Sequence, residues 1–553
     1  MRILSRTSRI WVVLVTSVYG SALFAAEPLP INRTEVEQQQ KALLEQAEQQ
    51  RESLQRQQPL SAPEALPTDD DGVCHNVRHI ALEGSSVLSL RTQKTIVAPW
   101  QHRCLTVSHM RQLVRAVSQQ YLERGYVTSQ AWLPEQDVST GVLRIAITEG
   151  RIESITQQGK TPHSLAMVFP GSQGRLLNLR DLEQGLEQLN RLTSQPVTID
   201  IQPGHQPGYS RIQIVNKGKA FPASINFSAD NSGCTCATLM SSSLTLDNPL
   251  QLAERWNLSA AHDTAFQREK WNRTLTGGVT LPYGYWLFSY QNHWNDFHQP
   301  IPSSLWHYQG KSQSQRFGIN RTLFRDGHQK LALDIAFTRR RTENRLSKQV
   351  LTNSSALVNS LTLGPHYSRR IGQGYATFNP TVSWGLRGLG ATRDRPHAQD
   401  VPRSQFLKYS LSASYLYPLA PSLYYLTTAY AQTSPHNLFI NEQIAVGGHY
   451  SVRGFKAQSL NGVQGAYWRN EINWQPGLFP ALGDMTLIAA LDAGWVKKQR
   501  GRTEGGSIAG AAVGLTLNAR HLSHSVTLGK PLLYPDTLAP DRWAFYWQTT
   551  LAF

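Results

Sequence analysis

The chain has 553 residues and a mass of 61.9 kDa, so we expect two or three domains rather than one. A mean hydropathy of −0.37, with no run of ~18 apolar residues beyond the N-terminus, excludes a helical membrane protein but not a membrane β-barrel. The formal net charge is +16, yet the basic residues are scattered and no nucleic-acid-binding signature accompanies them. We therefore expect no nucleic-acid partner.

Residues 1–26 have the anatomy of a secretory signal peptide. Three arginines precede an apolar run from Ile10 to Val15, and small residues follow from Ala22 to Ala26. The apolar run is short and interrupted by hydroxyl residues, which favours a cleaved signal over a membrane anchor. We expect export into an oxidising compartment, where cysteines form disulfides.

Four cysteines therefore carry information about the exported chain. Cys74 and Cys104 bracket 29 residues and predict a disulfide, which stabilises a domain by about 3–4 kcal/mol on the chain-entropy model. Cys234 and Cys236 would lie ~6.6 Å apart in an extended strand, near the limit for a bridge. We favour a small loop disulfide there over a metal site, because neither pair has further ligands at zinc spacing. No metal or cofactor is expected.

The first segment of the exported chain, residues 27–58, predicts one long helix over 31–58. Thr34 and Glu37 form a capping box, and nine glutamines occur between positions 38 and 58. A helix that is polar all round is solvated, packed on a partner, or unstable alone. Its ~25 residues would span about 37 Å, enough to cross a membrane inside a water-filled pore. A linker rich in Pro and Asp follows at 59–73.

Two small α+β modules of about 70 residues each are predicted next, at 74–150 and 151–217. The expected elements of the first are a strand at Val77 to Leu82, a helix around Met110 to Tyr121, and strands at Val127 to Leu133 and Gly141 to Thr148. Those of the second are a helix at Leu179 to Leu192 and strands at Val197 to Ile201 and Arg211 to Val215.

From residue 218 onward the helical period disappears, and about sixteen strands alternate apolar and polar residues, as in 374–387 and 407–417. The span 218–553 allows about 21 residues per strand and connection, the size typical of outer-membrane barrels. A soluble β-sandwich or propeller is the alternative. Aromatic residues at strand ends, and a terminal Phe553 on the same face as Trp543, favour the barrel.

The most specific short segment is the glycine-rich run 447–455, although from its residues alone an ordinary surface loop remains possible. Its last four residues match the VRGF motif of outer-membrane transporters that carry POTRA domains: Val452, Arg453, Gly454 and Phe455. Stretches within 126–150 and 177–210 resemble the two POTRA domains of two-partner secretion (TpsB) transporters.

The resemblance implies a membrane all-β 16-stranded outer-membrane barrel at 218–553, two periplasmic α+β POTRA domains and an N-terminal plug helix. In the family, the motif arginine lies in a loop folded into the pore and pairs with an aspartate on the inner wall. Alternation in 485–493 turns Asp492 toward the lumen, so Arg453 and Asp492 fit those roles. A solvated Asp492 without a partner is the alternative.

The resemblance also implies that the chain secretes a large partner exoprotein across the outer membrane of a Gram-negative bacterium. The cargo would be a haemolysin, an adhesin or a contact-dependent inhibition toxin with an N-terminal secretion domain. No ATP-binding loop is visible, so we expect transport without ATP. Outer-membrane lipid, and the outer-membrane assembly machinery during biogenesis, are the other expected partners.

We expect the cargo to add as a strand to an edge of the first POTRA domain. The candidate residues are Val127, Thr128, Ser129, Gln130, Ala131 and Trp132. A strand covered by its own helix is the alternative, because natural sheet edges are usually protected.

Other functions are less well supported by the sequence. An assembly factor for outer-membrane proteins is the alternative within the same superfamily, but those factors carry more POTRA domains. No catalytic constellation is visible, so we do not expect an enzyme. A passive porin would leave the periplasmic modules unexplained.

Overall fold

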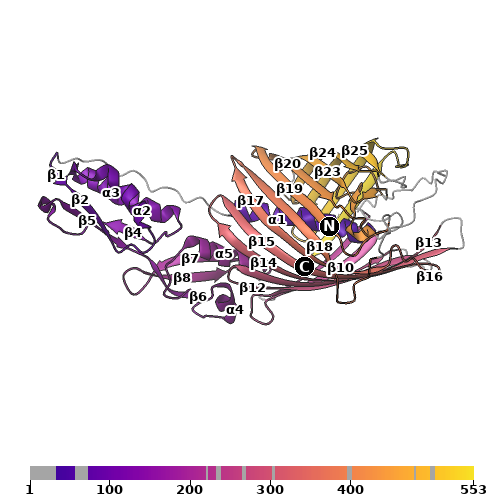
Figure 1. The fold of residues 1–553 in the computed structure, drawn as a ribbon, viewed down its shortest axis with the longest axis horizontal. Helices are drawn as coiled ribbons and strands as arrows, with labels where there is room; N and C mark the ends of the chain where they lie inside the picture. The colour runs from indigo at the N-terminus through magenta and orange to yellow at the C-terminus, as the bar shows by residue number, and fades with distance from the viewer. Residues whose placement is uncertain are drawn as a thin grey trace, which may run out of the picture.

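The computed structural model describes residues 33–56, 72–218, 222–231, 238–264, 270–301, 306–394, 401–456, 458–478, 481–498 and 505–553. Two small α+β modules precede a closed β-barrel, and one helix lies inside the barrel (Figure 1). This confirms the predicted fold class. None of the described helices is both long enough and apolar enough to cross a bilayer. The predicted signal peptide and the pair Cys234 and Cys236 lie outside the described residues.

Sixteen antiparallel strands close the barrel, since β9 pairs with both β10 and β27. A two-residue strand, β16 (Gln349–Val350), extends the hairpin between β15 and β17. The barrel strands are β9 (Ala223–Asp230), β10 (Leu239–Asp247), β11 (Arg255–Asp263), β12 (Trp271–Tyr283), β13 (Trp286–Pro300), β14 (His307–Arg325), β15 (Gln329–Leu346), β17 (Ala356–Ile371), β18 (Gly374–Leu386), β19 (Leu407–Ala420), β20 (Leu423–Thr433), β23 (Gly465–Trp474), β24 (Asp484–Val496), β25 (Gly506–Asn518), β26 (Leu522–Leu533) and β27 (Ala544–Ala552).

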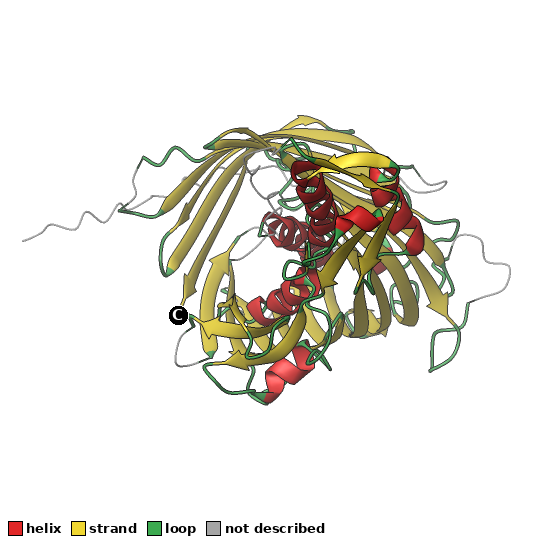
Figure 2. Cartoon of the chain, turned by 90° about the vertical axis from the view of Figure 1, so that its left-hand side faces the viewer, coloured by secondary structure: helices red, strands yellow, loops and turns green. Residues whose placement is uncertain are grey.

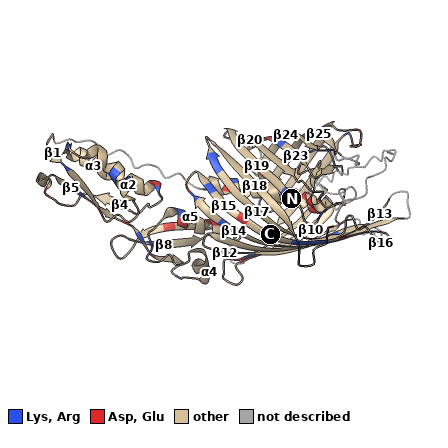
Figure 3. Cartoon of the chain, in the orientation of Figure 1, with Lys and Arg blue, Asp and Glu red and all other residues tan. Residues whose placement is uncertain are grey.

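Alternation along each strand gives the barrel an apolar outer surface and a polar lumen, as the pleat of a strand requires. On β24, Leu491 is 58% exposed on the outside, whereas the next residue, Asp492, is 1% exposed on the inside. On β18, Phe378 faces outward and Asn379 is buried inward. Basic and acidic residues occur along the barrel strands as well as on both modules (Figure 3).

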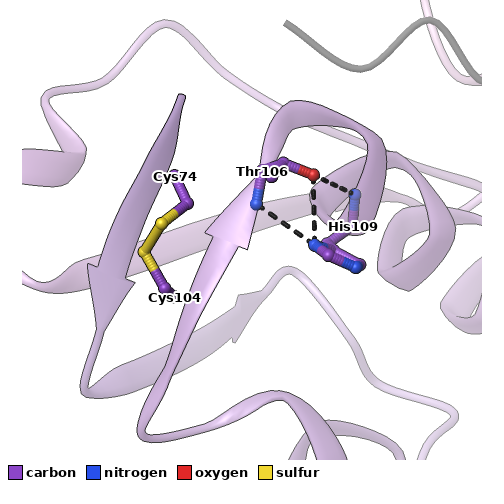
Figure 4. The surroundings of a disulfide bond; sticks show 4 residues. All are labelled: Cys74, Cys104, Thr106 and His109. Atoms are coloured by element: carbon purple, nitrogen blue, oxygen red, sulfur yellow. Dashed lines mark hydrogen bonds between the residues drawn. A yellow bond between two sulfur atoms is a disulfide. The ribbon is translucent and has the colours of Figure 1, made fainter. Parts of the chain in front are cut away.

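The first module contains two small sheets. β1 (Cys74–Val77) pairs with β3 (Arg103–Thr106), and the predicted Cys74–Cys104 disulfide joins these strands with a Cα–Cα distance of 5.3 Å (Figure 4). Thr106 then caps α3 (Val107–Glu123) together with His109. The bridge therefore anchors the start of the helix that covers the module.

The second sheet of this module has the order β2-β5-β4. Its strands are β2 (His79–Glu83), β5 (Val142–Thr148) and β4 (Gln130–Trp132). The helix α3 buries Met110, Leu113, Val117 and Tyr121, the spacing of one helical face. The short helices α2 (Leu90–Val97) and η1 (Ala98–Trp100) were not predicted, because eight residues with few apolar positions carry little periodic signal.

The second module is a three-stranded sheet of order β6-β8-β7 covered by two helices. Its elements are β6 (Arg151–Gln157), α4 (His163–Val168), α5 (Leu179–Asn190), β7 (Val197–Pro203) and β8 (Tyr209–Asn216). The modules touch directly, since the Leu179 amide donates to the Gly125 carbonyl and the Leu177 amide to that of Gly150. The positions of β6 and α4 were not predicted from the sequence.

The second module is docked on one end of the barrel. Ser194 donates to Asp247 at 2.6 Å, Arg191 to the Ala253 carbonyl at 2.7 Å, and the Gly284 amide to the Met167 carbonyl at 2.9 Å. These barrel residues lie in or next to the turns after β10 and β12. The turns at this end therefore face the modules, and the opposite end of the barrel points away from them (Figure 1).

Candidate transport site in the barrel lumen

The VRGF motif sits in a loop that folds into the barrel. β21 (Ile444–Val446) pairs with β22 (Leu460–Gly462), and the loop between these short strands carries the motif. Val452 and Phe455 are fully buried in a cluster with residues of β21, β23, β24 and β25. The apolar motif residues thus fasten the loop to the inner wall and fix the position of Arg453 between them.

The structure brings Arg453 and Asp492 together. The arginine Nε and Nη2 donate to the two carboxylate oxygens at 2.6 and 2.7 Å, and its backbone amide donates to Oδ2 at 3.1 Å. Both side chains are almost completely buried. A bidentate, charge-assisted pair of this kind fixes orientation as well as position. Because both groups are desolvated, removing either partner would leave a buried charge with fewer contacts.

A second carboxylate, which the sequence analysis missed, completes the site. Glu471 on β23 lies 2.9 Å from Arg453 Nη1 and 2.8 Å from Arg469 Nη2. Arg469 also donates to the His449 carbonyl in the motif loop at 2.9 Å. The alternation of residues along β23 could have predicted this carboxylate from the sequence. Trp468 and Ile472 face outward, so Arg469 and Glu471 face the lumen.

Two glycines of the barrel wall let the motif loop approach the strands. A Cβ at Gly510 would lie 1.9 Å from the Arg453 carbonyl oxygen, and one at Gly529 would lie 2.6 Å from the Gly454 amide nitrogen. Gly454 itself has φ +104°, a conformation that favours glycine, and its own Cβ would meet the Lys530 backbone at 2.7 Å. The loop backbone thus lies directly against β25 and β26, and only glycine permits this distance.

The polar helix predicted near the N-terminus occupies the lumen. α1 (Arg33–Gln55) lies within the ring of strands, as Figures 1 and 2 show. Its side chains reach the wall through hydrogen bonds to residues on β21, β18 and β19. These bonds run from Gln40 to the Ala445 carbonyl at 2.6 Å, from Asn379 to Gln50 at 3.1 Å and from Arg51 to Ser414 at 2.6 Å. The helix is rich in glutamine because it lies in a polar lumen, where its side chains bond to polar groups of the wall.

The N-terminal end of α1 is held by a buried ionic cluster. Glu35 lies 2.6 Å from Arg340 on β15 and accepts hydrogen bonds from Ser312 and Asn441. Arg340 also pairs with Glu442 at 2.5 Å, and Glu442 in turn pairs with Lys408. Glu442 lies two residues before β21, so the cluster connects the helix to the segment that leads into the motif loop.

The other end of α1 meets the second module and the barrel at one residue. Ser53 donates to Glu187 of α5 at 3.2 Å, and the same carboxylate pairs with Arg325 at 3.1 Å and with Lys330. Burial raises the pKa of Glu187, but the two cations lower it by more, and the result is a pKa of about 2. Glu187 is therefore the anion at which helix, module and barrel meet.

The candidate cargo-binding strand is shorter than predicted. Val127, Thr128 and Ser129 lie in the turn before β4, where the Ser129 hydroxyl accepts from the Gly150 amide and Thr128 packs on Gly150. Only Gln130–Trp132 form the strand, which is at the sheet edge as expected.

The backbone of this edge strand is partly occupied. The Ala131 amide donates to the Ser118 hydroxyl of α3 at 3.0 Å. Trp132 presents a side chain that is 50% exposed. The strand therefore offers an aromatic surface more readily than free backbone donors.

These features together define a class of protein: an outer-membrane transporter of the two-partner secretion type, with a polar plug helix and a loop-borne arginine inside its barrel. Residues 208–517 match the family model of haemolysin secretion/activation proteins ShlB/FhaC/HecB. Residues 75–150 match the ShlB-type POTRA domain, and residues 151–203 match a second POTRA domain.

Individual relatives agree with the family model. The chain is 40% identical to the outer membrane transporter CdiB of Dickeya dadantii over 97% of both chains. It is 28% identical to the hemolysin transporter protein ShlB of Serratia marcescens, over 89% of this chain and 88% of that one. The solved structure of CdiB from Escherichia coli matches with 37% identity and a TM-score of 0.91, over 95% of this chain and 99% of that chain.

The chain belongs to the ShlB/FhaC/HecB family of two-partner secretion transporters. It is an outer-membrane transporter of a partner exoprotein, with its POTRA domains in the periplasm. The barrel end that carries the modules is accordingly the periplasmic end.

Proposed function

We propose that the partner is an exoprotein of the contact-dependent inhibition toxin type with an N-terminal secretion domain. The support is the 40% and 37% identity to CdiB transporters along nearly the whole chain, against 28% to a haemolysin transporter. Because cargo choice resides in surfaces that the cargo touches, similarity spread over modules and barrel bears on it more than similarity in the barrel alone.

The observation that carries the mechanism is the set of polar contacts that hold α1 in the lumen. Gln40, Gln50 and Arg51 contact the wall through hydrogen bonds to polar groups, which water or an extended polypeptide can replace. The helix leaves the pore when cargo engages the periplasmic modules, and the extended cargo then takes its place. Folding of the cargo outside the cell makes passage irreversible, so no nucleotide is needed.

Capture begins at the edge of the first POTRA domain. The exposed Trp132 side chain on β4 contacts an apolar residue of the cargo, and main-chain pairing follows where the strand continues. The Arg453–Asp492 pair keeps the motif loop against β25 and β26 during transport, so that the pathway beside it stays open. Outer-membrane lipid surrounds the barrel, and the assembly machinery inserts it.

A secretion assay tests the proposal. The full chain is expressed with the N-terminal secretion domain of either an inhibition toxin or a haemolysin, and the exported domain is measured in the medium. We expect export of the first and little of the second, and loss of export in Arg453→Ala. The matched control is Arg345→Ala, which removes an arginine paired with Glu343 on the barrel exterior.

Three results would contradict the proposal. Preferential export of the haemolysin domain would overturn the choice of cargo. Normal export by Arg453→Ala would remove the role given to the loop anchor. A fall in other outer-membrane proteins on deletion of this chain, with no export of either domain, would favour the assembly-factor alternative.

A further inference from the structure

The outer surface of β15 changes from apolar to basic at one position. Its inward residues include Ala336, Thr338 and Arg340, whereas Phe337, Arg339 and Arg341 point toward the membrane side. Arg339 and Arg341, named here the basic pair, are both exposed. Below the pair, toward the periplasm, the outward residues of this strand are leucine, isoleucine and phenylalanine.

One neighbouring strand, β14, changes polarity at the same level. On β14, Phe317 is in register with Phe337, but the next outward residue, Gln315, is in register with Arg339. Gln313 is likewise in register with Arg341. The upper edge of the apolar band therefore crosses both strands at one height, with amide and guanidinium groups directly above it.

That height is the outer interface of the membrane. The turn between β14 and β15 lies at the periplasmic end, because Arg325 and Lys330 contact Glu187 there. Ten residues separate Gln329 from Arg339, and at about 3.3 Å per residue and a tilt of roughly 40° they rise about 25 Å. This equals the height of the apolar band of an outer-membrane barrel. The basic pair thus lies among the headgroups of the outer leaflet.

The carboxylates on this part of the surface are already paired. Asp296 on β13 is held by Arg273 at 2.8 Å, and Glu343 on β15 is held by Arg345 at 2.6 Å. No ion pair joins the basic pair to a carboxylate within the part of the chain that the structure describes. An arginine facing lipid is costly at the bilayer centre and nearly without cost at the interface. At this height, the nearest available anions for Arg339 and Arg341 are the headgroups of the outer leaflet.

We propose that the basic pair, with Gln313 and Gln315, binds the phosphate groups of an anionic lipid of the outer leaflet. Guanidinium groups bind phosphate oxygens in a bidentate manner, and the amide side chains donate further hydrogen bonds. Side chains two residues apart on one strand are separated by about 6.6 Å, so both arginines reach one phosphorylated headgroup. This site lies on the outside of the barrel and is independent of the proposed cargo.

The test measures lipid bound to the full-length protein. Delipidated protein in detergent is mixed with bis-phosphorylated lipid A, and the bound lipid is counted by native mass spectrometry. Lipid A lacking both phosphates, and an excess of inorganic phosphate as competitor, separate a lipid headgroup from free phosphate as the ligand. We expect binding of the phosphorylated lipid, weak binding of the unphosphorylated one, and little displacement by inorganic phosphate.

Matched variants localise the site. Arg339→Gln/Arg341→Gln is expected to weaken binding roughly 25-fold, because each cation near an anionic surface contributes a factor of about five. Arg321→Gln/Arg369→Gln removes two outward arginines at the periplasmic end of β14 and β17 and is expected to bind as the unaltered protein does. Arg339→Lys/Arg341→Lys, which keeps the charge, should lose less than the glutamine variant.

Folding is checked by the shift of the unheated barrel on a denaturing gel, so that lost binding is not confused with lost structure. Equal binding by the unaltered protein and the folded Arg339→Gln/Arg341→Gln variant would overturn the proposal. The same loss in both double variants would also overturn it, since it would reflect net charge alone. Complete displacement by inorganic phosphate would assign the site to free phosphate rather than to lipid.

Discussion

Neutralising Glu35 should release the plug helix from the lumen. The Glu35 carboxylate is buried, pairs with Arg340 at 2.6 Å and accepts hydrogen bonds from Ser312 at 3.2 Å and Asn441 at 2.9 Å. Glu35→Gln keeps an oxygen acceptor of the same size but loses the charge. Arg340 retains its pair with Glu442 at 2.5 Å, so the variant does not leave an isolated buried cation.

The magnitude follows from that remaining pair. A hydrogen bond to a charged group contributes about 1.5–3 kcal/mol, and the penalty for an unpaired buried charge does not apply here. We therefore expect α1 to be held about 2 kcal/mol less tightly, which lowers the ratio of occupied to vacated pores about 30-fold.

Single-channel recording in planar bilayers measures this ratio as the fraction of time in the large-conductance state. Deletion of residues 33–56 gives the reference for an empty pore. The control is Glu45→Gln on the same helix, because the Glu45 side chain is 55% exposed and pairs with Lys41 of α1 itself. An open fraction in Glu35→Gln equal to that of Glu45→Gln, with a large conductance in the deletion, would refute the reasoning about the ionic cluster. No change on deletion would refute the plug.

Three other predictions address the remaining contacts. Asp492→Asn leaves Arg453 paired with Glu471 but removes the charge from its two hydrogen bonds to Asp492, and a hydrogen bond to a charged group contributes about 1.5–3 kcal/mol. We therefore expect a loss of about 3 kcal/mol in barrel stability, measured as a lower unfolding temperature; an unchanged temperature would contradict a buried ion pair. Reduction of Cys74–Cys104 should destabilise the first module by about 3–4 kcal/mol in urea unfolding, and Cys74→Ser should remove the effect of reductant. Because the pKa of Glu187 is lowered to about 2 from 4.5, its anion stabilises the docked second module fully above about pH 4.5, and this contribution disappears as the pH falls toward 2. Limited proteolysis of the second module should therefore accelerate only below pH 4.5, and Glu187→Gln should cleave at a pH-independent, faster rate.

The sequence predicts the features of this fold that depend on local periodicity. Alternation along a strand follows from the pleat, so the inward position of Asp492 and the number of barrel strands could be predicted from the sequence. The length and polarity of α1 likewise follow from its residues. The family resemblance supplied the partner of Arg453.

Contacts that form only when the barrel closes could not be predicted from the sequence. From the sequence alone, Gly510 and Gly529 are glycines that weaken the interior of two strands. Only the structure shows that they leave room for the backbone of the motif loop. The pairing of Glu35 with Arg340 joins residues 305 positions apart in the chain, and no local pattern specifies it. The strand β4 is shorter than predicted because Val127, which precedes it, packs on the core of the second module, a tertiary effect that overrides strand propensity.

The connection between α1 and the first module has a kinetic consequence. The helix that occupies the lumen is covalently joined, through residues 57–71, to the strand β1. A helix that has left the pore therefore stays near it at an effective concentration on the order of millimolar for a short connection, whatever the abundance of the protein. In the proposed mechanism, the cargo therefore competes with a helix whose local concentration stays constant, and the helix returns to the pore by an intramolecular step once the last of the cargo has passed.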